Sequence, residues 1–352
     1  MTSDLPNIGK ISPEVFDEVI LPHLGRRRPD VLVGPHHGLD TGVIDLGGGR
    51  VMAITTDPVF VVPPYGWERS GWFAVHILAS DVATSGLPPT HMTIDLNLPL
   101  TMRRTELERL WKRVHQECET LGIAIVAGHT GRYEGCEYPM VGGATVMAMG
   151  SADRYVTPAM AREGDQVIVT KGAAIEAAGL FAVTFPEMIE ERHGAAFARR
   201  AADLFWQMSV VDDAMAAVRA GVRDDGVTSM HDATECGVWG GLYEIARASG
   251  TGMVIEKEKV IVQPEVAGIC ELFGIDPYSS ISEGTLLITC RPHRADRVVE
   301  LLHERRIPAS IVGEVCPARK GIRLIEDGKE HPLEHPRIDP FWAAFGAAAA
   351  RR

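Results

Sequence analysis

Three aspartates in the first half of the chain have the residue type and the surroundings of a magnesium site. Asp40 follows Gly38 in the glycine-rich turn GPHHGLDTGV before an expected strand, and Asp57 stands at the expected end of another strand. Asp81 lies late in an expected helix with an apolar face, where an unpaired carboxylate is costly to bury. Mg²⁺ prefers carboxylate oxygens together with substrate phosphates, which glycine-rich backbone allows to approach. Each aspartate alone fits a turn or a helix surface, whereas the three in one domain suggest a shared role in metal binding.

The stretch MHDATECGVWGGLYEIA marks a second candidate site in the other half of the chain. Asp232 and Glu235 have the spacing of a capping box before a helix, so ordinary N-terminal capping is one interpretation. The other interpretation is that the glycine-rich helix start binds an anion with its free N–H groups.

The six cysteines are scattered, without the CxxC spacing of a zinc site, and are expected to be reduced thiols. Cys236 directly follows Glu235 at the expected start of a helix, where N–H dipoles lower the pKa of a thiol. It is either a reactive thiol that faces a cleft or a small packing residue, since free cysteine is among the most buried residue types.

Four histidines of the first half raise a further hypothesis, because histidine is the commonest ligand of transition metals. They are His36, His37, His76 and His129. The alternative is that they are unrelated loop and core residues.

Strands and helices alternate along the chain, which predicts mixed α/β structure. In the first half, strands are expected over 42–47, 50–61, 91–100, 123–128 and 138–150, and helices over 12–25, 72–86 and 104–122. In the second half, strands are expected over 165–172, 226–232, 284–290 and 309–315, and helices over 234–250 and 294–306, with a fraying terminal helix in FWAAFGAAAARR. The sequence pattern changes near residue 155, where a new series of strands and helices begins, so we expect two domains, 1–155 and 156–352.

Composition excludes several classes of protein. The chain has 352 residues, 45% of them hydrophobic, and a formal net charge of -12, which argues against nucleic acid or an anionic membrane as the main partner. No apolar run approaches the length of a membrane span, and the start MTSDLPNIGK lacks the regions of a signal peptide, so a cytoplasmic protein is expected. The sequence contains no GxxxxGK[ST], HExxH or GxSxG motif and no GxGxxG after a strand.

Taken in order, several stretches resemble the AIR synthase superfamily, which includes hydrogenase-maturation carbamoyl dehydratases, selenophosphate synthetases and thiamine-monophosphate kinases. The matching pieces are GKISPEVFDEVILPHLG, VLVGPHHGLDTGVIDLG, TDPVFV, AVHILASDVATSGLPP, GIAIVAGHTG, GDQVIVTKGAAIEAAGLFA, HDATECGVWGGLYEIA and ISEGTLLI. They cover most of the chain and are most similar to the branch of the hydrogenase expression/formation protein. The resemblance implies a two-domain α/β (α+β) fold whose N-terminal domain pairs in a homodimer, with ATP near the subunit interface.

The resemblance also implies roles for individual residues. The aspartates of the first domain, Asp40, Asp57 and Asp81, would bind magnesium held with ATP, and Gly38 and Asp232 would border the nucleotide. Further contacts with phosphate or substrate are expected from Lys171, Thr234 and Glu235. If Cys236 faces the cleft, it is a candidate catalytic residue that would replace or covalently assist the terminal cysteine of the hydrogenase-maturation enzymes.

Departures from the family pattern leave the three aspartates expected to bind magnesium unchanged, but they leave the identity of the substrate open. Ser80 stands where relatives commonly have asparagine, His129 where they often have an acidic residue, and Cys236 where they often have glycine; the loop GLDTGV also differs. The hydrogenase-maturation enzymes carry a carbamoyl group on a terminal cysteine, whereas this chain ends in AFGAAAARR and its last cysteine, Cys316, falls in or beside an expected strand.

The sequence therefore predicts an ATP- and Mg²⁺-dependent enzyme that activates an amide-like oxygen or another small acceptor by phosphoryl transfer. Two alternatives stay open at this point. One is a nucleotide-binding assembly protein without turnover, which would act with a protein partner in metallocofactor maturation. The other is a small-molecule kinase like thiamine-monophosphate kinase.

Overall fold

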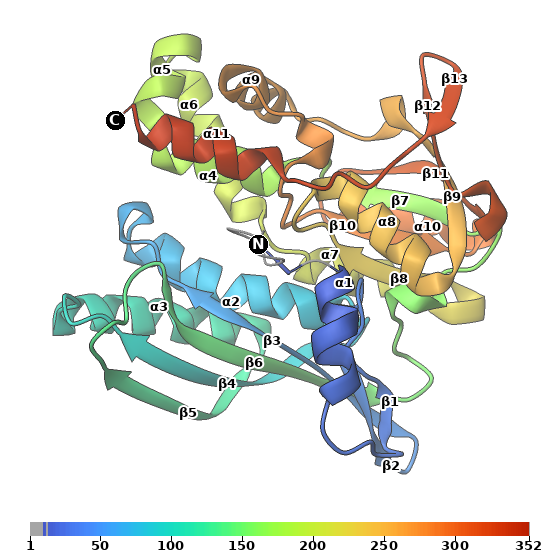
Figure 1. The fold of residues 1–352 in the computed structure, drawn as a ribbon, viewed down its shortest axis with the longest axis horizontal. Helices are drawn as coiled ribbons and strands as arrows, with labels where there is room; N and C mark the ends of the chain where they lie inside the picture. Colours follow the sequence, from blue (N-terminus) through green and yellow to red (C-terminus); the bar gives the residue numbers. More distant parts are fainter. Residues whose placement is uncertain (1–9, 12, 352) are drawn as a thin grey trace.

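The computed structural model describes residues 10, 11 and 13–351 and contains two mixed α/β halves stacked on each other (Figure 1). The first half is built on a six-stranded sheet in the order β1-β2-β3-β6-β4-β5, antiparallel except for the parallel pair β4–β5. Its strands are β1 Val31–Val33, β2 Gly42–Gly47, β3 Arg50–Phe60, β4 Pro89–Leu98, β5 Ala124–Arg132 and β6 Met140–Ser151.

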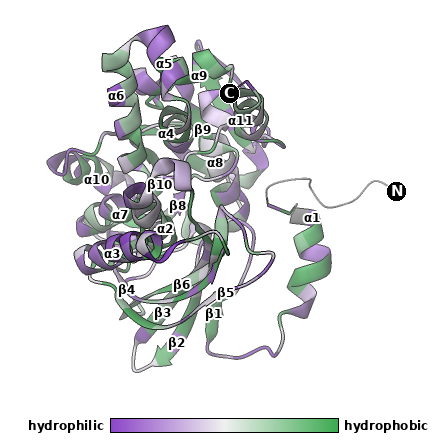
Figure 2. Ribbon diagram, turned by 90° about the vertical axis from the view of Figure 1, so that its left-hand side faces the viewer, coloured by the Kyte–Doolittle hydropathy of each residue, from purple (hydrophilic) through white to green (hydrophobic). Residues whose placement is uncertain are grey.

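Two helices, α2 (Trp67–Ala83) and α3 (Arg104–Leu121), cover the face of this sheet that looks toward the second half. The helix α3 connects the parallel strands β4 and β5 and turns a polar side to solvent, as Figure 2 shows by its purple colour. The opposite face of the sheet is open over its central strands. A shallow hollow there is lined by polar side chains that include Thr56, Thr93, Asp95, His129 and Thr145.

The second half is built on a seven-stranded sheet in the order β13-β12-β9-β11-β7-β10-β8. Its strands are β7 Gln166–Thr170, β8 Val227–Asp232, β9 Thr251–Glu256, β10 Leu286–Cys290, β11 Ala309–Pro317, β12 Ile322–Glu326 and β13 Lys329–Pro332. Its helices are α4 Ile175–Thr184, α5 Pro186–His193, α6 Ala195–Asp203, α7 Val211–Ala217, α8 Gly237–Ser249, α9 Pro264–Phe273, α10 Pro292–Glu304 and α11 Pro340–Ala349.

The helix α2 joins the two halves into one packed unit. Its apolar side chains belong to a continuous core that also contains residues of β3, β6, α7 and α10. Ser80 of α2 is fully buried, and its hydroxyl accepts a hydrogen bond from the backbone N–H of Val210 at 3.0 Å. The serine that departs from the family pattern therefore satisfies a backbone donor of the other half.

The segment before α11 runs back across the second half, and α11 lies over α4 (Figure 1). Phe341 is 1% exposed and packs edge-on against Phe181 of α4 at 5.2 Å between ring centres. Phe345 contacts Phe181 and Phe185. The expectation of a fraying terminal helix was therefore wrong over 340–349, because an aromatic cluster holds this helix.

Two further segments differ from the expected elements. The region expected as a helix over 12–25 is a short α-helical turn (α1, Pro13–Val15) followed by a π-helical turn (Phe16–Ile20) and a 3₁₀ turn at Pro22, while residue 12 lies outside the described residues. The helix α2 begins at Trp67, five residues before the expected start at residue 72. In the described part of the chain, no helix is both long and apolar enough to cross a membrane.

Candidate active site

Four aspartates from four elements meet where the two halves face each other. Asp40 lies in the loop before β2, Asp57 on β3, Asp81 in the last turn of α2, and Asp232 at the end of β8. Asp57 is within β3, because the strand continues through Pro58 to Phe60 instead of ending at the aspartate. The structure thus places the three predicted aspartates of the first half next to the predicted aspartate of the second.

Asp81 is 9% exposed, which rules out the interpretation of a residue on the helix surface. Its Oδ2 accepts a hydrogen bond from the Thr55 hydroxyl of β3 at 3.0 Å. Burial and the neighbouring carboxylates of Asp232 and Asp57 raise the pKa of Asp81 well above its usual value. A cation among these carboxylates would reverse that effect and favour the charged form.

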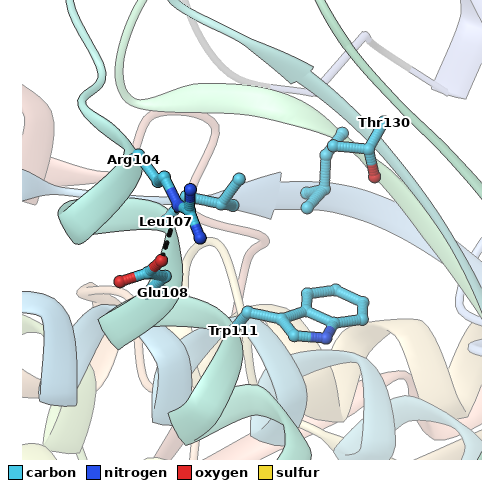
Figure 3. A pocket seen from close by; sticks show the side chains of 6 residues that line it. Arg104, Leu107, Glu108, Trp111 and Thr130 are labelled. Carbon is cyan, nitrogen blue, oxygen red and sulfur yellow. Dashed lines mark hydrogen bonds and ion pairs between the residues drawn. The ribbon is translucent and has the colours of Figure 1, made fainter.

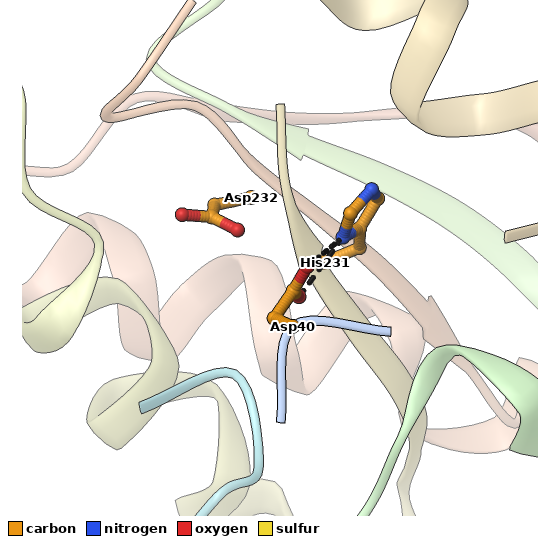
Figure 4. Close-up of side chains that lie close together, drawn as sticks. All are labelled: Asp40, His231 and Asp232. Atoms are coloured by element: carbon orange, nitrogen blue, oxygen red, sulfur yellow. Dashed lines mark hydrogen bonds and ion pairs between the residues drawn. The ribbon is translucent and has the colours of Figure 1, made fainter. Parts of the chain in front are cut away.

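Asp40 is held by a histidine of the second half (Figure 4). The Nδ1 of His231 lies 2.7 Å from Oδ1 of Asp40, and its Nε2 lies 2.7 Å from Oε2 of Glu244 on α8. Burial alone would lower the pKa of His231, but the two carboxylates raise it well above its usual value. The close approach of the Asp40 loop to α8 requires Gly38, which has φ +73° and whose hypothetical Cβ would lie 2.8 Å from the backbone oxygen of Glu244. Gly38 therefore acts in the structure as a packing residue that brings Asp40 to His231.

Asp232 supplies the strongest sign of a bound cation. The residue is fully buried, and neither of its carboxylate oxygens has a hydrogen-bond partner among the described residues. Burial and the charge of Asp40 raise the pKa of Asp232 to about 7, although the charges of His231 and Lys10 lower it. Leaving a carboxylate buried without a partner is costly, and oxygen donors from several aspartates are the set that Mg²⁺ takes. The residues present fit a divalent cation.

Two glutamates that were not predicted lie beside the aspartates. Glu283, in the segment before β10, is 3% exposed, and Glu176 lies in the first turn of α4. The backbone N–H of Glu283 donates to Oε2 of Glu176 at 3.1 Å. Burial and the charges of Asp232 and Glu176 raise the pKa of Glu283, and burial with the charges of Asp339 and Glu235 raises the pKa of Glu176 to about 7. The stretch ISEGTLLI contained Glu283, but nothing local in the sequence marked it as buried beside Asp232.

Thr234 and Glu235 border the same site, and Lys10 lies over them. The ammonium of Lys10 donates to the Thr234 hydroxyl at 3.1 Å, and its backbone N–H donates to Oε2 of Glu235 at 3.2 Å. These contacts bring Lys10, which was not among the predicted site residues, next to the two predicted residues Thr234 and Glu235.

Cys236 differs from expectation in its electrostatics. It is 7% exposed, has φ +62°, and precedes the first residue of α8, so the helix begins at Gly237 and the predicted capping box does not form. The Cys236 N–H donates to the Asp339 carboxylate at 2.7 Å, and its Sγ donates to the Pro336 carbonyl at 2.8 Å. The prediction of a lowered pKa was wrong: burial and the charges of Asp339 and Glu235 raise the pKa of the thiol to about 12. The helix start does bind an anion, and that anion is Asp339 of the chain itself.

Lys171 forms a buried ion pair instead of an open cationic contact. Its Nζ lies 2.8 Å from Oδ2 of Asp213 and donates to the Ser209 carbonyl at 2.7 Å. His36 and His37 share the loop between β1 and β2, whereas His76 lies on α2 and His129 on β5. In the part of the chain that the structure describes, the possible metal-binding group is Asp40, His231 and Asp232. Cys316 lies on β11 and is buried, as the sequence suggested.

A separate hollow lies between α3 and the strands β4 and β5 (Figure 3). It is lined by Leu96, Leu107, Trp111 and Thr130, with the ion pair between Arg104 and Glu108 at its rim. None of the clustered carboxylates lines it, so it is separate from the candidate active site.

The fold and the site together define a two-domain protein in which one half supplies three clustered aspartates and the other a histidine–aspartate pair. The chain belongs to the AIR synthase-related family: the N-terminal domain of that family matches residues 38–152 and the C-terminal domain matches residues 162–325. Among curated relatives, carbamoyl dehydratase HypE of Escherichia coli is 28% identical over 86% of this chain and 87% of its own length. A hydrogenase expression/formation protein of Methanocaldococcus jannaschii is 24% identical over 94% of this chain and 96% of its own length. The predicted branch of the superfamily is thereby confirmed.

Solved structures show the same fold. A HypE–HypF complex superposes with a TM-score of 0.70 at 21% identity, covering 92% of this chain and 99% of the other. HypE in complex with ATP gives a TM-score of 0.61 at 20% identity, covering 96% and 99% of the two chains. ThiL complexed with AMPPCP and TMP gives 0.65 at 23% identity, covering 83% and 88%. The predicted two-domain α/β fold is confirmed.

Proposed function

We propose that this chain is an ATP- and Mg²⁺-dependent enzyme that transfers the γ-phosphoryl group of ATP to an amide-like oxygen of a small acceptor. The observation that carries this proposal is the buried carboxylate of Asp232, which has no hydrogen-bond partner among the described residues and lies beside three further aspartates. A divalent cation held by these aspartates would compensate their buried charge and would supply neutralisation of phosphate charge.

Within this proposal Asp40, Asp57, Asp81 and Asp232 hold magnesium, which supplies neutralisation of phosphate charge when bound. The ammonium of Lys10, beside Thr234, is placed to contact the phosphates. Catalysis then consists mainly of positioning and electrostatic stabilisation, with little covalent chemistry on the protein.

Glu283 and Glu176 are the groups placed to move a proton on the acceptor side. A carboxyl group with a pKa near neutrality exchanges protons efficiently at physiological pH, and Glu176 has a pKa raised to about 7. Deprotonation of an amide-like group would make its oxygen a better nucleophile toward ATP.

The relatives support this acceptor class. The E. coli relative is named a carbamoyl dehydratase, and a related HypE was solved in complex with ATP. ThiL with AMPPCP and TMP represents the rival possibility of a small-molecule kinase, and product analysis with thiamine monophosphate separates the two.

We also propose a homodimer that pairs the open faces of the two N-terminal sheets, and a protein partner in maturation comparable to the one in the HypE–HypF complex. The open face carries a polar hollow next to β3, the strand that bears Asp57, so pairing would place the partner subunit near the nucleotide. Sedimentation analysis of the full chain tests the dimer, and a monomer at micromolar concentration would contradict it.

The decisive test of the activity replaces Asp57 or Asp81 by Asn. Both variants should lose Mg²⁺-dependent ATP hydrolysis while keeping the circular dichroism spectrum of the native protein, because each removes a cation ligand without changing side-chain shape. Asp296→Asn, an exposed position on α10, is the matched control and should retain activity. Full activity in both cluster variants would refute the metal assignment, and tight ATP binding without turnover in the native protein would favour a non-catalytic assembly protein.

A further inference from the structure

His231 has the hydrogen-bonding arrangement of a metal-bound histidine. Its Nε2 faces the carboxylate of Glu244 at 2.7 Å, and its Nδ1 faces the carboxylate of Asp40 at 2.7 Å. Histidines that bind metals through one ring nitrogen usually donate the other N–H to a carboxylate, which fixes the orientation of the ring. His231 is 3% exposed, so its ring has little freedom to turn away.

Asp232 independently indicates a ligand at the same place. Both of its oxygens are buried and without a hydrogen-bond partner among the described residues, and its carboxyl group points toward the space beside the Asp40–His231 pair (Figure 4). One ligand atom each from Asp40, His231 and Asp232 lie within 4.8 Å of one another, a spacing that a single ion can bridge.

We infer that Asp40, Asp232 and Nδ1 of His231 form a cation subsite with one nitrogen ligand, which takes a transition metal such as Mn²⁺ in preference to Mg²⁺. Imidazole nitrogen suits transition metals, whereas Mg²⁺ takes oxygen ligands. In this subsite the ion takes the place of the proton between Nδ1 and Asp40, and Glu244 orients the ring. The inference deepens the proposed function, on which it rests only for the use of the metal beside ATP.

His76 is a comparable buried histidine that lies outside the proposed subsite. Its Nε2 also contacts a carboxylate, Glu117, at 2.9 Å, but its Nδ1 contacts the Ser209 hydroxyl and no acidic residue. It is therefore the matched control for His231: a buried histidine of α2 with one carboxylate partner.

The test uses the full chain with Mn²⁺ alone, without nucleotide, and reads the coordination by electron spin echo envelope modulation. The native protein should show the ¹⁴N coupling of a directly bound imidazole. That coupling should vanish in His231→Asn and persist in His76→Asn. Glu244→Gln should keep the coupling but weaken Mn²⁺ binding by about 10- to 100-fold, as for other carboxylates that orient a metal-bound histidine.

Absence of ¹⁴N coupling in Mn²⁺-loaded native protein, or its persistence in His231→Asn, would overturn the inference. Failure of the native protein to bind Mn²⁺ would do the same. If His231→Asn does not fold, the native spectrum and the Glu244→Gln titration still decide, since a site of oxygen ligands alone gives no coupling and no such loss. ATP turnover with Mg²⁺ but an all-oxygen Mn²⁺ spectrum would refute this inference only, whereas nitrogen coupling without any turnover would refute the proposed function only.

Discussion

Replacing Glu176 by Gln should stabilise the protein at pH values above 4.5, the ordinary pKa of the side chain, and not below it. Glu176 sits half-buried in the first turn of α4, accepts the backbone N–H of Glu283, and lies near the carboxylates of Asp339 and Glu235. Glutamine keeps the shape and the acceptor oxygen but carries no charge, so the variant isolates the cost of ionising the carboxyl group in this place.

The pKa gives the size and the sign of the effect. The pKa of Glu176 rises from 4.5 to about 7 in the folded protein. Below the pKa that Glu176 has in the unfolded chain, the carboxyl group is protonated in the folded and the unfolded state, so the variant and the native protein are equally stable. Between the two values the unfolded chain is ionised while the folded chain keeps its proton, so native stability falls relative to the variant as pH rises. Above the folded value the difference is constant at about 3 kcal/mol, or about 2 kcal/mol after allowance for partial exposure.

Urea unfolding of both proteins without metal or nucleotide, at about pH 5 and about pH 8, measures this difference. At about pH 5 the unfolded chain is already mostly ionised, so the variant should be more stable by only about 1 kcal/mol, and the difference should grow to its full size at about pH 8. Glu187→Gln, an exposed glutamate on α5, makes the same chemical change on the surface and should leave stability unaltered at both values. A variant that is no more stable than the native protein at about pH 8, or as strongly stabilised at about pH 5 as at about pH 8, would refute the reasoning.

The remaining predictions concern two buried residues for which chemical roles were considered. Lys171→Met should destabilise the protein by about 3–5 kcal/mol in urea unfolding, because it leaves Asp213 charged, buried and unpaired; a loss of ATP affinity at unchanged stability would instead indicate a contact with phosphate. Cys236 should resist iodoacetamide in the native protein, with Cys136, the one cysteine that is not buried, reacting first, because the Cys236 thiol donates to Pro336 and its pKa is raised to about 12. Fast labelling of Cys236, slowed by ATP, would show that the thiol faces the site after all.

Local sequence was sufficient to predict those elements whose formation and ends depend only on residues close to them in the chain. The amphipathic run that predicted a helix over 104–122 is α3, Arg104–Leu121, and Gly122 ends it in the left-handed conformation. The strand expected over 226–232 is β8, Val227–Asp232. In these places the periodicity and the terminal glycine decide the structure without help from distant segments.

The candidate site was predictable only in part, because its burial depends on contacts between the halves. Helical periodicity allowed Asp81 to lie on the surface, whereas α2 is packed on the sheet of one half and on α7 of the other. The pairing of His231 with Asp40 joins positions 191 residues apart, and Glu283 carries no local sign of its burial. The helix α8 begins at Gly237 instead of the expected residue 234. Asp339, about a hundred residues later, accepts a hydrogen bond from the backbone N–H of Cys236 just before the helix.

The docking of α11 bears on how an acceptor reaches the site. Asp339 lies on the start of α8 beside Glu235, and from there the helix leads away over α4, with Phe341 1% exposed in the aromatic cluster. Moving this helix into the site would take the Phe341 side chain out of its buried packing, which costs about 3–5 kcal/mol. An acceptor borne by a separate molecule meets no such barrier. Under the proposed function, the reaction would then be bimolecular and saturable in that molecule, and one copy of the protein could process many acceptors in succession.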